Sequence, residues 1–285
     1  MNRFFNNLFR SAPKAAVKTT TTLAVETLED RMVPTVTTIA GGATVGTTIK
    51  IDQTNGDDTC MVQQYSINST AYVRVVENGR TTANFNMRER NIQRIEYHGH
   101  YGNDSFRNAT KLPSKAFGGY GNDRLIGSTT AVDQFEGSFG NDRLEGLGGN
   151  DILKGGFGND LVYGGLGHDT INGEGDSDVL FGDDGNDVIL GGAGVDYLFG
   201  GFDNDRLFGE GGKDFLFGEG GDDYLNGGQD GIADFLKGGL GRDTFQADMF
   251  ALLSPLFSTN VDAPQDLNTD EGDVIAGLGG LVLRS

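Results

Sequence analysis

Residues 137–217 repeat one phrase of nine residues without interruption: GSFGNDRLE, GLGGNDILK, GGFGNDLVY, GGLGHDTIN, GEGDSDVLF, GDDGNDVIL, GGAGVDYLF, GGFDNDRLF and GEGGKDFLF. Each copy begins with Gly, has Asp at position six and has an aliphatic or aromatic residue at position eight. Less regular copies extend the pattern to residues 99–246. A fixed period of this kind indicates a stack of equivalent structural units, in which each unit contacts its neighbours.

The repeat predicts the local structure of each unit. The segment Asp-x-apolar-x favours a short strand whose eighth side chain points inward, because side chains alternate faces along a strand. The segment Gly-x-x-Gly favours a tight turn, since glycine adopts positive φ at no steric cost. Asp176 and Asp203 replace the fourth glycine in two copies, and aspartate tolerates the same conformation at modest cost.

The eighth position is apolar in all fifteen copies that keep the aspartate: Phe106, Leu125, Phe135, Leu144, Leu153, Val162, Ile171, Leu180, Ile189, Leu198, Leu207, Leu216, Leu225, Leu236 and Phe245. We therefore expect an all-β fold, a parallel β-roll (β-solenoid) of stacked nonapeptide half-turns with a narrow core between two sheets. Two nonapeptides form one coil, which gives about eight coils.

The composition of the chain excludes several classes of function and partner. The chain has 285 residues, 47 of them Gly, and a net charge of −19. This charge argues against nucleic acid and anionic membranes as partners and favours a chain that collects cations. The single cysteine, Cys60, excludes an intramolecular disulfide; we interpret it as a buried apolar residue, with a reactive thiol as the alternative. No apolar run is long enough to predict a transmembrane helix.

The segments outside the array divide the chain further. We expect a disordered or targeting tail over 1–34, a β-rich cap over 35–98 that starts the solenoid, the β-roll over 99–246 and a C-terminal cap over 247–285. Asn78-Gly79 predicts a hairpin turn, and the apolar run 249–257 is compatible with a short helix. The acidic stretch 266–277 does not match an EF-hand loop, because Gly and the final Glu are misplaced. Leu28-Glu-Asp-Arg31-x-x-Pro34 resembles a signature near the N-termini of bacterial cell-surface and exported proteins.

The array, with its consensus Gly-Gly-x-Gly-x-Asp-x-apolar-x, resembles the repeats-in-toxin (RTX) family of calcium-binding proteins. The resemblance implies calcium ions between half-turns 18 residues apart, held by aspartates and by carbonyls of positions one to four. Such an all-oxygen donor set suits calcium, and we expect on the order of ten ions. The implied aspartate ligands are Asp104, Asp123, Asp142, Asp151, Asp160, Asp169, Asp178, Asp187, Asp196, Asp205, Asp214, Asp223 and Asp243. The implied carbonyl donors are Gly146, Gly148, Gly155, Gly156, Gly158, Gly164, Gly165, Gly167, Gly182, Gly185, Gly191, Gly192, Gly194, Gly200, Gly201, Gly209, Gly211, Gly218 and Gly220.

Other residues have two interpretations. His98 and His100 are either solvent-facing or a transition-metal pair. The asparagines at position five favour turn conformations, and Glu174, Glu210 and Glu219 at position two are expected on the surface. Sites that involve Asp133, Asp234, the Asp223–Asp243 pair or the aspartate-free turn 108–117 are expected to deviate from the pattern.

These observations predict an exported bacterial protein that is disordered without calcium, folds on binding it and serves as a non-catalytic structural or surface module. Cell-surface or extracellular polysaccharide or protein is the expected partner. The alternative is a β-helical polysaccharide-modifying enzyme or an accessory module of one, although the chain contains no catalytic motif that we recognise.

Overall fold

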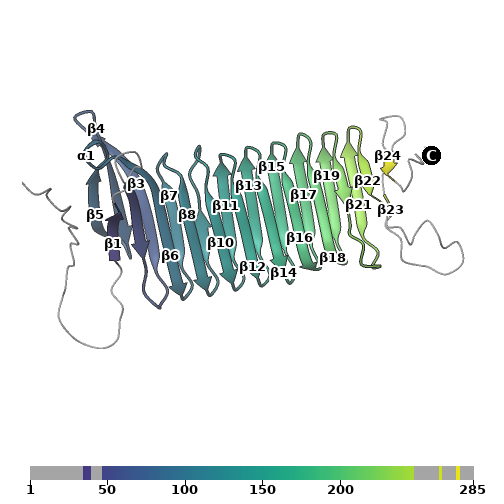
Figure 1. The fold of residues 1–285 in the computed structure, drawn as a ribbon, viewed down its shortest axis with the longest axis horizontal. Helices are drawn as coiled ribbons and strands as arrows, with labels where there is room; N and C mark the ends of the chain where they lie inside the picture. Colours follow the sequence, from purple (N-terminus) through teal and green to yellow (C-terminus); the bar gives the residue numbers. More distant parts are fainter. Residues whose placement is uncertain (1–34, 40–46, 247–262, 265–273, 277–285) are drawn as a thin grey trace, which may run out of the picture.

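The computed structural model describes residues 35–39, 47–246, 263–264 and 274–276. The described strands stack side by side into one elongated body, with the strands roughly perpendicular to its long axis (Figure 1). They form two sheets of twelve strands each, which we name sheet A and sheet B. The fold is therefore all-β, as predicted.

The order in sheet A is β1 (Thr35–Ile39), β2 (Thr47–Asp52), β6 (Ile92–Tyr101), β8 (Ser114–Tyr120), β10 (Gln134–Phe139), β12 (Ile152–Phe157), β14 (Thr170–Gly175), β16 (Val188–Gly194), β18 (Arg206–Gly212), β20 (Tyr224–Asn226), β22 (Thr244–Gln246) and β24 (Val274–Ala276). The order in sheet B is β23 (Ala263–Pro264), β21 (Phe235–Leu240), β19 (Phe215–Gly220), β17 (Tyr197–Phe202), β15 (Val179–Asp184), β13 (Leu161–Leu166), β11 (Arg143–Gly148), β9 (Arg124–Ile126), β7 (Ser105–Ala109), β3 (Thr59–Ile67), β4 (Thr70–Glu77) and β5 (Arg80–Asn86).

Successive strands from β6 to β24 alternate between the two sheets, so that each strand pairs in parallel with the strands one coil before and after it. In the regular part the register is 18 residues, with Leu144 opposite Val162 in sheet B and Leu153 opposite Ile171 in sheet A. One coil therefore contains two nonapeptides. About eight such coils form a parallel β-solenoid between residues 95 and 246, as predicted from the period.

The core is a single file of side chains between the sheets. All fifteen predicted eighth-position residues are buried, with no more than 2% of any side chain exposed. Ala116 fills the same position in the turn that lacks an aspartate. Each fully buried Leu or Ile contributes roughly 1.5–3 kcal/mol, so this file supplies most of the apolar stabilisation of the roll.

The strands are longer than the sequence predicted. A typical strand such as β11 covers positions seven to nine of one repeat and one to three of the next, so only positions four to six form the turn. Backbone φ is positive at two places, position four and position two. Asp176 and Asp203 at position four have φ of 75° and 73°, as expected, and Glu174 at position two has φ of 77°.

The N-terminal end of the solenoid is closed by antiparallel strands. Strands β3, β4 and β5 form two hairpins, and the predicted Asn78-Gly79 turn has φ values of 48° and 75°. A four-residue helix that the sequence did not indicate, α1 (Met87–Arg90), follows; the Asn86 side chain accepts hydrogen bonds from two of its backbone N–H groups. No helix in the described part of the chain is long and apolar enough to cross a membrane.

Two short strands extend the sheets after residue 246. Phe235 in β21 pairs with Ala263 in β23, and Phe245 in β22 pairs with Ile275 in β24, both in parallel. The predicted tail 1–34, the apolar run 249–257 and most of the acidic stretch 266–277 lie outside the described residues.

Candidate metal sites along the two edges

The position-six aspartates form two rows, one at the start of the strands of each sheet. The sheet A row contains Asp133, Asp151, Asp169, Asp187, Asp205, Asp223 and Asp243, and the sheet B row contains Asp58, Asp104, Asp123, Asp142, Asp160, Asp178, Asp196, Asp214 and Asp234. Each is buried, with 0–7% of the residue exposed. Every predicted aspartate ligand belongs to one of these rows, so the fold brings them together as the period predicted.

In all of these aspartates except Asp58 and Asp133, one carboxylate oxygen joins neighbouring coils in the same way. Oδ1 accepts a hydrogen bond from the backbone N–H of the aspartate one coil earlier, as in Asp142 N to Asp160 Oδ1 at 2.7 Å. The corresponding distances along both rows are 2.7–3.0 Å. Even the coils lengthened to twenty residues keep the bond, with Asp223 N to Asp243 Oδ1 at 2.9 Å.

The second carboxylate oxygen, Oδ2, has no hydrogen-bond partner in twelve aspartates, although it is buried. These are Asp104, Asp123, Asp142, Asp151, Asp160, Asp169, Asp178, Asp187, Asp196, Asp205, Asp214 and Asp223. A buried oxygen that has lost water and gained no partner costs about 1–3 kcal/mol, and more for a charged group. Twelve equivalent cases indicate that a ligand belongs there.

The position-one glycines line the same space. A Cβ on Gly137 would collide with Oδ2 of Asp142 in its own repeat and with the carbonyl oxygen of Gly155 in the next coil. Most position-one glycines along the array meet the same pair of oxygens. Glycine is thus required here to leave room beside a carboxylate and a carbonyl, and not for its backbone freedom.

Burial makes these carboxylates reluctant to ionise in the absence of a cation. Loss of hydration raises the pKa of Asp160 from 3.8 to about 8, partly offset by its hydrogen bond from Asp142 and reinforced by neighbouring carboxylates. Burial likewise raises the pKa of Asp142 to about 7 and that of Asp196 to about 6, in each case partly offset by the hydrogen bond from the aspartate one coil earlier. A row of such groups favours whatever supplies positive charge, either protons or a metal ion.

The donors available at the edges are all oxygens. Among the described residues, no three His, Cys, Asp or Glu side chains converge in the manner of a side-chain metal cluster. A cation at these edges would therefore be held by one carboxylate oxygen from each coil together with backbone carbonyls. Calcium accepts six to eight oxygen ligands in loose geometry, whereas magnesium requires a stricter octahedron, so the residues present fit calcium.

Asp133 and Asp58 differ from these twelve aspartates because the protein itself donates hydrogen bonds to both of their carboxylate oxygens. Oδ1 of Asp133 accepts from the N–H and the hydroxyl of Ser114, and its Oδ2 accepts from the N–H of Ser128. Asp58 accepts from Thr54 and Asn78. In the turn without an aspartate, Ser114 takes position six. At these three positions the strands are kept, but no carboxylate oxygen is left without a hydrogen-bond partner.

The predicted glycine donors occupy four kinds of place. Those at position one lie beside Oδ2: Gly146, Gly155, Gly164, Gly182, Gly191, Gly200, Gly209 and Gly218. Those at position two (Gly156, Gly165, Gly192 and Gly201) and at position four (Gly158, Gly167, Gly185 and Gly194) have positive φ. Gly148, Gly211 and Gly220, at position three, lie at or near the ends of strands.

Position five carries a second ladder that sequence reasoning missed. Oδ1 of Asn141 accepts from the backbone N–H of Asn159, and Oδ1 of Asn159 accepts from that of Ser177, both at 2.9 Å. His168 and Ser177 play the same part in their coils. The recurrence of a side-chain acceptor at position five was the sequence signal for this role.

The N-terminal histidines and the cysteine are placed as follows. His98 contacts Glu96, with Nε2 and Oε1 2.8 Å apart, and its ring stacks on Phe117. His100 lies 3.9 Å from an oxygen of Asp52. Cys60 is buried opposite Phe106 in the core, as expected, and burial raises the pKa of its thiol.

Comparison with known proteins supports this description of the edges. The family model of the RTX calcium-binding nonapeptide repeat matches four segments, residues 116–131, 136–171, 172–207 and 199–231. No curated protein and no solved structure matches the chain. RTX repeats bind calcium and are typical of exported bacterial proteins. The part of the chain between residues 116 and 231 is thus a series of RTX calcium-binding nonapeptide repeats.

Proposed function

We propose that this chain is an exported bacterial protein whose β-roll folds when it binds on the order of ten calcium ions, and that it acts as a non-catalytic structural module at the cell surface or outside the cell. The observation that carries the proposal is the regular series of buried, unpartnered Oδ2 atoms. It is supported by the matched repeats and by the all-oxygen donor set.

The number of ions follows from the gaps between coils. A gap qualifies when the aspartates on both sides have an unpartnered Oδ2. The sheet B row offers six such gaps between Asp104 and Asp214, and the sheet A row offers four between Asp151 and Asp223, ten in total. Ten divalent ions would supply about +20, close to the net charge of −19. Calcium, when bound, neutralises carboxylates that otherwise repel each other.

Calcium dependence would also explain how such a chain is exported. Extracellular calcium modules bind at about 10⁻⁴–10⁻³ M, far above the free concentration inside cells. The empty chain would then stay unfolded before export and fold outside. A partner at the surface, either protein or polysaccharide, would be presented on a rod whose rigidity calcium controls.

Isothermal titration calorimetry of the full chain tests the proposal through its stoichiometry, and Asp160→Asn provides a sharp variant. Asp160 borders two qualifying gaps, so the variant should lose about two of about ten ions, because asparagine keeps the shape but loses the charge. Asp133→Asn is the matched control, since both oxygens of Asp133 already have protein partners, and it should lose none.

Circular dichroism completes the test. The wild-type chain should show a β spectrum in calcium and lose it when calcium is chelated at neutral pH. An unchanged β spectrum after chelation would show that folding does not depend on calcium. Saturation at one or two ions, or an equal loss in both variants, would show that the rows of aspartates are not the sites.

A further inference from the structure

A hollow opens in sheet B where two successive strands are short. Strands β7 and β9 end at Ala109 and Ile126, whereas β3 and β11 on either side of them continue to Ile67 and Gly148. The two short strands lead into the two irregular turns of the array, 108–117 and 127–136. The hollow has a volume of about 440 Å³, and we call it the notch.

The protein's own polar groups hold the floor of the notch in shape. Asn108 and Thr110 line it and are only 2% and 5% exposed. Oδ1 of Asn108 accepts from the N–H and the hydroxyl of Thr110, and its Nδ2 donates to the carbonyl of Leu112 at 2.8 Å. The backbone N–H of Lys111 donates to Oε1 of Gln64 on β3 at 3.4 Å. The notch is therefore formed before any ligand binds.

The lining of the notch contains two cations, Arg107 and Lys111, and no acid. In the sheet Arg107 lies between Met61 and Ile126, so no carboxylate stands opposite it. Neither cation forms an ion pair with any residue that the structure describes. The chain has 41 Asp and Glu against 22 Lys and Arg, which makes an acid-free hollow with two cations a distinct place. It favours an anionic group, held by charge-assisted hydrogen bonds.

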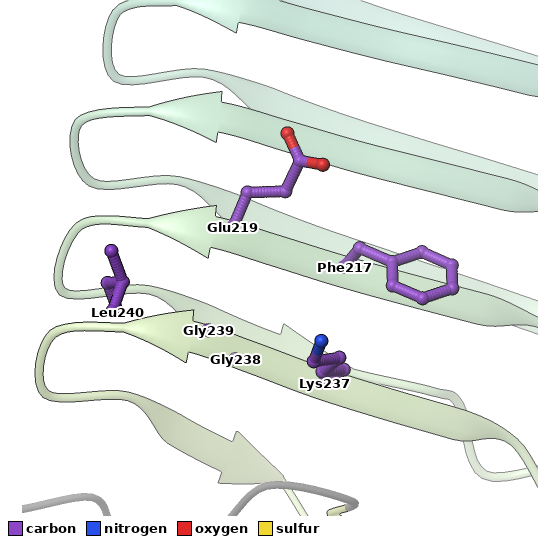
Figure 2. A pocket seen from close by; sticks show the side chains of 6 residues that line it. All are labelled: Phe217, Glu219, Lys237, Gly238, Gly239 and Leu240. Atoms are coloured by element: carbon purple, nitrogen blue, oxygen red, sulfur yellow. The ribbon is translucent and has the colours of Figure 1, made fainter.

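A second hollow on sheet B, of about 410 Å³, lacks this preference. Figure 2 shows Phe217 and Glu219 on one strand, Lys237 on the next, and Leu240 at the turn. Here the single cation shares the hollow with an acid and with apolar side chains. The positive lining of the notch is thus a property of its own residues, and Lys237 provides a matched comparison for Lys111.

The uncharged lining of the notch indicates the rest of the ligand. Small-molecule sites are usually lined by apolar side chains with few polar groups, but Gln64, Ser66 and Thr129 bring an amide and two hydroxyls to this one. Such groups both donate and accept hydrogen bonds, as sugar hydroxyls do. The volume lies within the range of about 300–1,000 Å³ that is typical of small-ligand sites.

We propose that the notch binds a saccharide unit that carries an anionic group, either a carboxylate or a phosphate. Arg107 and Lys111 hold the anion, and the amide and hydroxyl side chains bind the sugar hydroxyls. The inference names the chemistry of the surface partner in the proposed function and rests on that function only for the folding of the coils. The notch contains no aspartate of either row, so the two sites can be tested separately.

The test is calorimetric titration of the full chain, at saturating calcium, with glucuronate, glucose 1-phosphate, glucose and triglutamate. At least one of the two anionic sugars should bind at one site, tenfold or more tighter than glucose. Arg107→Ala and Lys111→Ala should each weaken this binding about tenfold, and Lys237→Ala should leave it unchanged. The tighter of the two sugars identifies the anionic group.

Several results would overturn the proposal: no binding of either anionic sugar, equal affinity for glucose, tighter binding of triglutamate, or equal weakening by Lys237→Ala. The calcium stoichiometry of the wild-type chain is read separately and tests the proposed function, not the notch.

Lysine acetylation of the wild-type chain, followed by mass spectrometry, covers the case in which a variant does not fold. Saturating anionic sugar should slow the acetylation of Lys111 and leave that of Lys237 unchanged. Equal rates for Lys111 with and without the sugar would also overturn the proposal.

Discussion

In the absence of calcium, acidification is expected to fold this chain, the reverse of ordinary acid denaturation. The reason lies in the two rows of buried aspartates. Burial raises the pKa of Asp142 from 3.8 to about 7 and that of Asp160 to about 8. The folded empty chain therefore binds more protons than the unfolded chain at any pH between about 4 and about 8, and its stability must fall as pH rises.

Each buried aspartate is expected to have a large effect on the stability of the calcium-free chain. A carboxyl group whose pKa moves from 3.8 to about 7 disfavours the folded state by about 4 kcal/mol once the pH exceeds the higher value. The penalty is absent below pH 3.8 and grows as pH rises towards 7 or 8. Three such aspartates at full strength would cost roughly 12 kcal/mol, similar to the entire folding free energy of a typical domain. Twelve share the unpartnered geometry.

Circular dichroism of calcium-depleted protein, recorded between pH 8 and pH 4, measures this effect. The β signal should be absent at pH 8 and should appear as the pH falls through the range 6–8. With calcium present the direction reverses, because protons compete for the same oxygens, and the calcium affinity should fall as the pH is lowered. A calcium-free chain that is fully folded at pH 8, or that gains no structure by pH 4–5, would refute the reasoning.

Three substitutions and one control, each measured as a shift in urea midpoint at saturating calcium, address the scaffold. Leu180→Ala, in the fully buried core, should destabilise the fold by about 2–5 kcal/mol. An unchanged urea midpoint would mean that the buried core does not stabilise the fold. Glu174→Gly relieves a φ of 77° and should stabilise by roughly 0.5–1 kcal/mol, whereas Glu136→Gly, in an ordinary strand position, should destabilise. Asn159→Ala removes the acceptor for the N–H of Ser177 and should lower the stability by about 0.5–1 kcal/mol. A gain in stability would contradict a stabilising role for the hydrogen bonds at position five.

The core and the coil register could be predicted from the sequence because each depends on one residue type at one period. An apolar residue at position eight needs only an inward direction, which strand alternation provides. The 18-residue pairing follows because two equivalent half-turns make one coil. The aspartate rows were predictable for the same reason, since residues at equal positions in stacked coils must lie above one another.

The reasons for the glycines could not be read from the sequence. The Gly-x-x-Gly pattern predicts that position one belongs to a tight turn, but the structure places it within a strand, where it leaves room beside Oδ2. Position two has positive φ even where Glu174, Glu210 and Glu219 occupy it, and nothing in the sequence indicates this. A one-dimensional pattern shows that a small residue recurs, but only the coils above and below show what it avoids.

The coils of this solenoid do not all need an unpartnered Oδ2 in order to form. Three positions, each at position six of a repeat, show this. Ser114, Asp133 and Asp58 each occupy the place that an Oδ2-bearing ligand occupies elsewhere. The strands that follow Ser114 and Asp133 keep parallel partners on both sides, and the strand that follows Asp58 keeps its parallel partner β7. At Asp133 and Asp58 the partners that complete the carboxylate are serine, threonine and asparagine groups of the protein itself. Protein donors therefore do at the N-terminal end of the rows what calcium would do in the regular coils. A roll built this way begins, at Asp58 and along the sheet A edge as far as Asp133, with positions that need no ion, and folding on calcium binding is expected to proceed from that end.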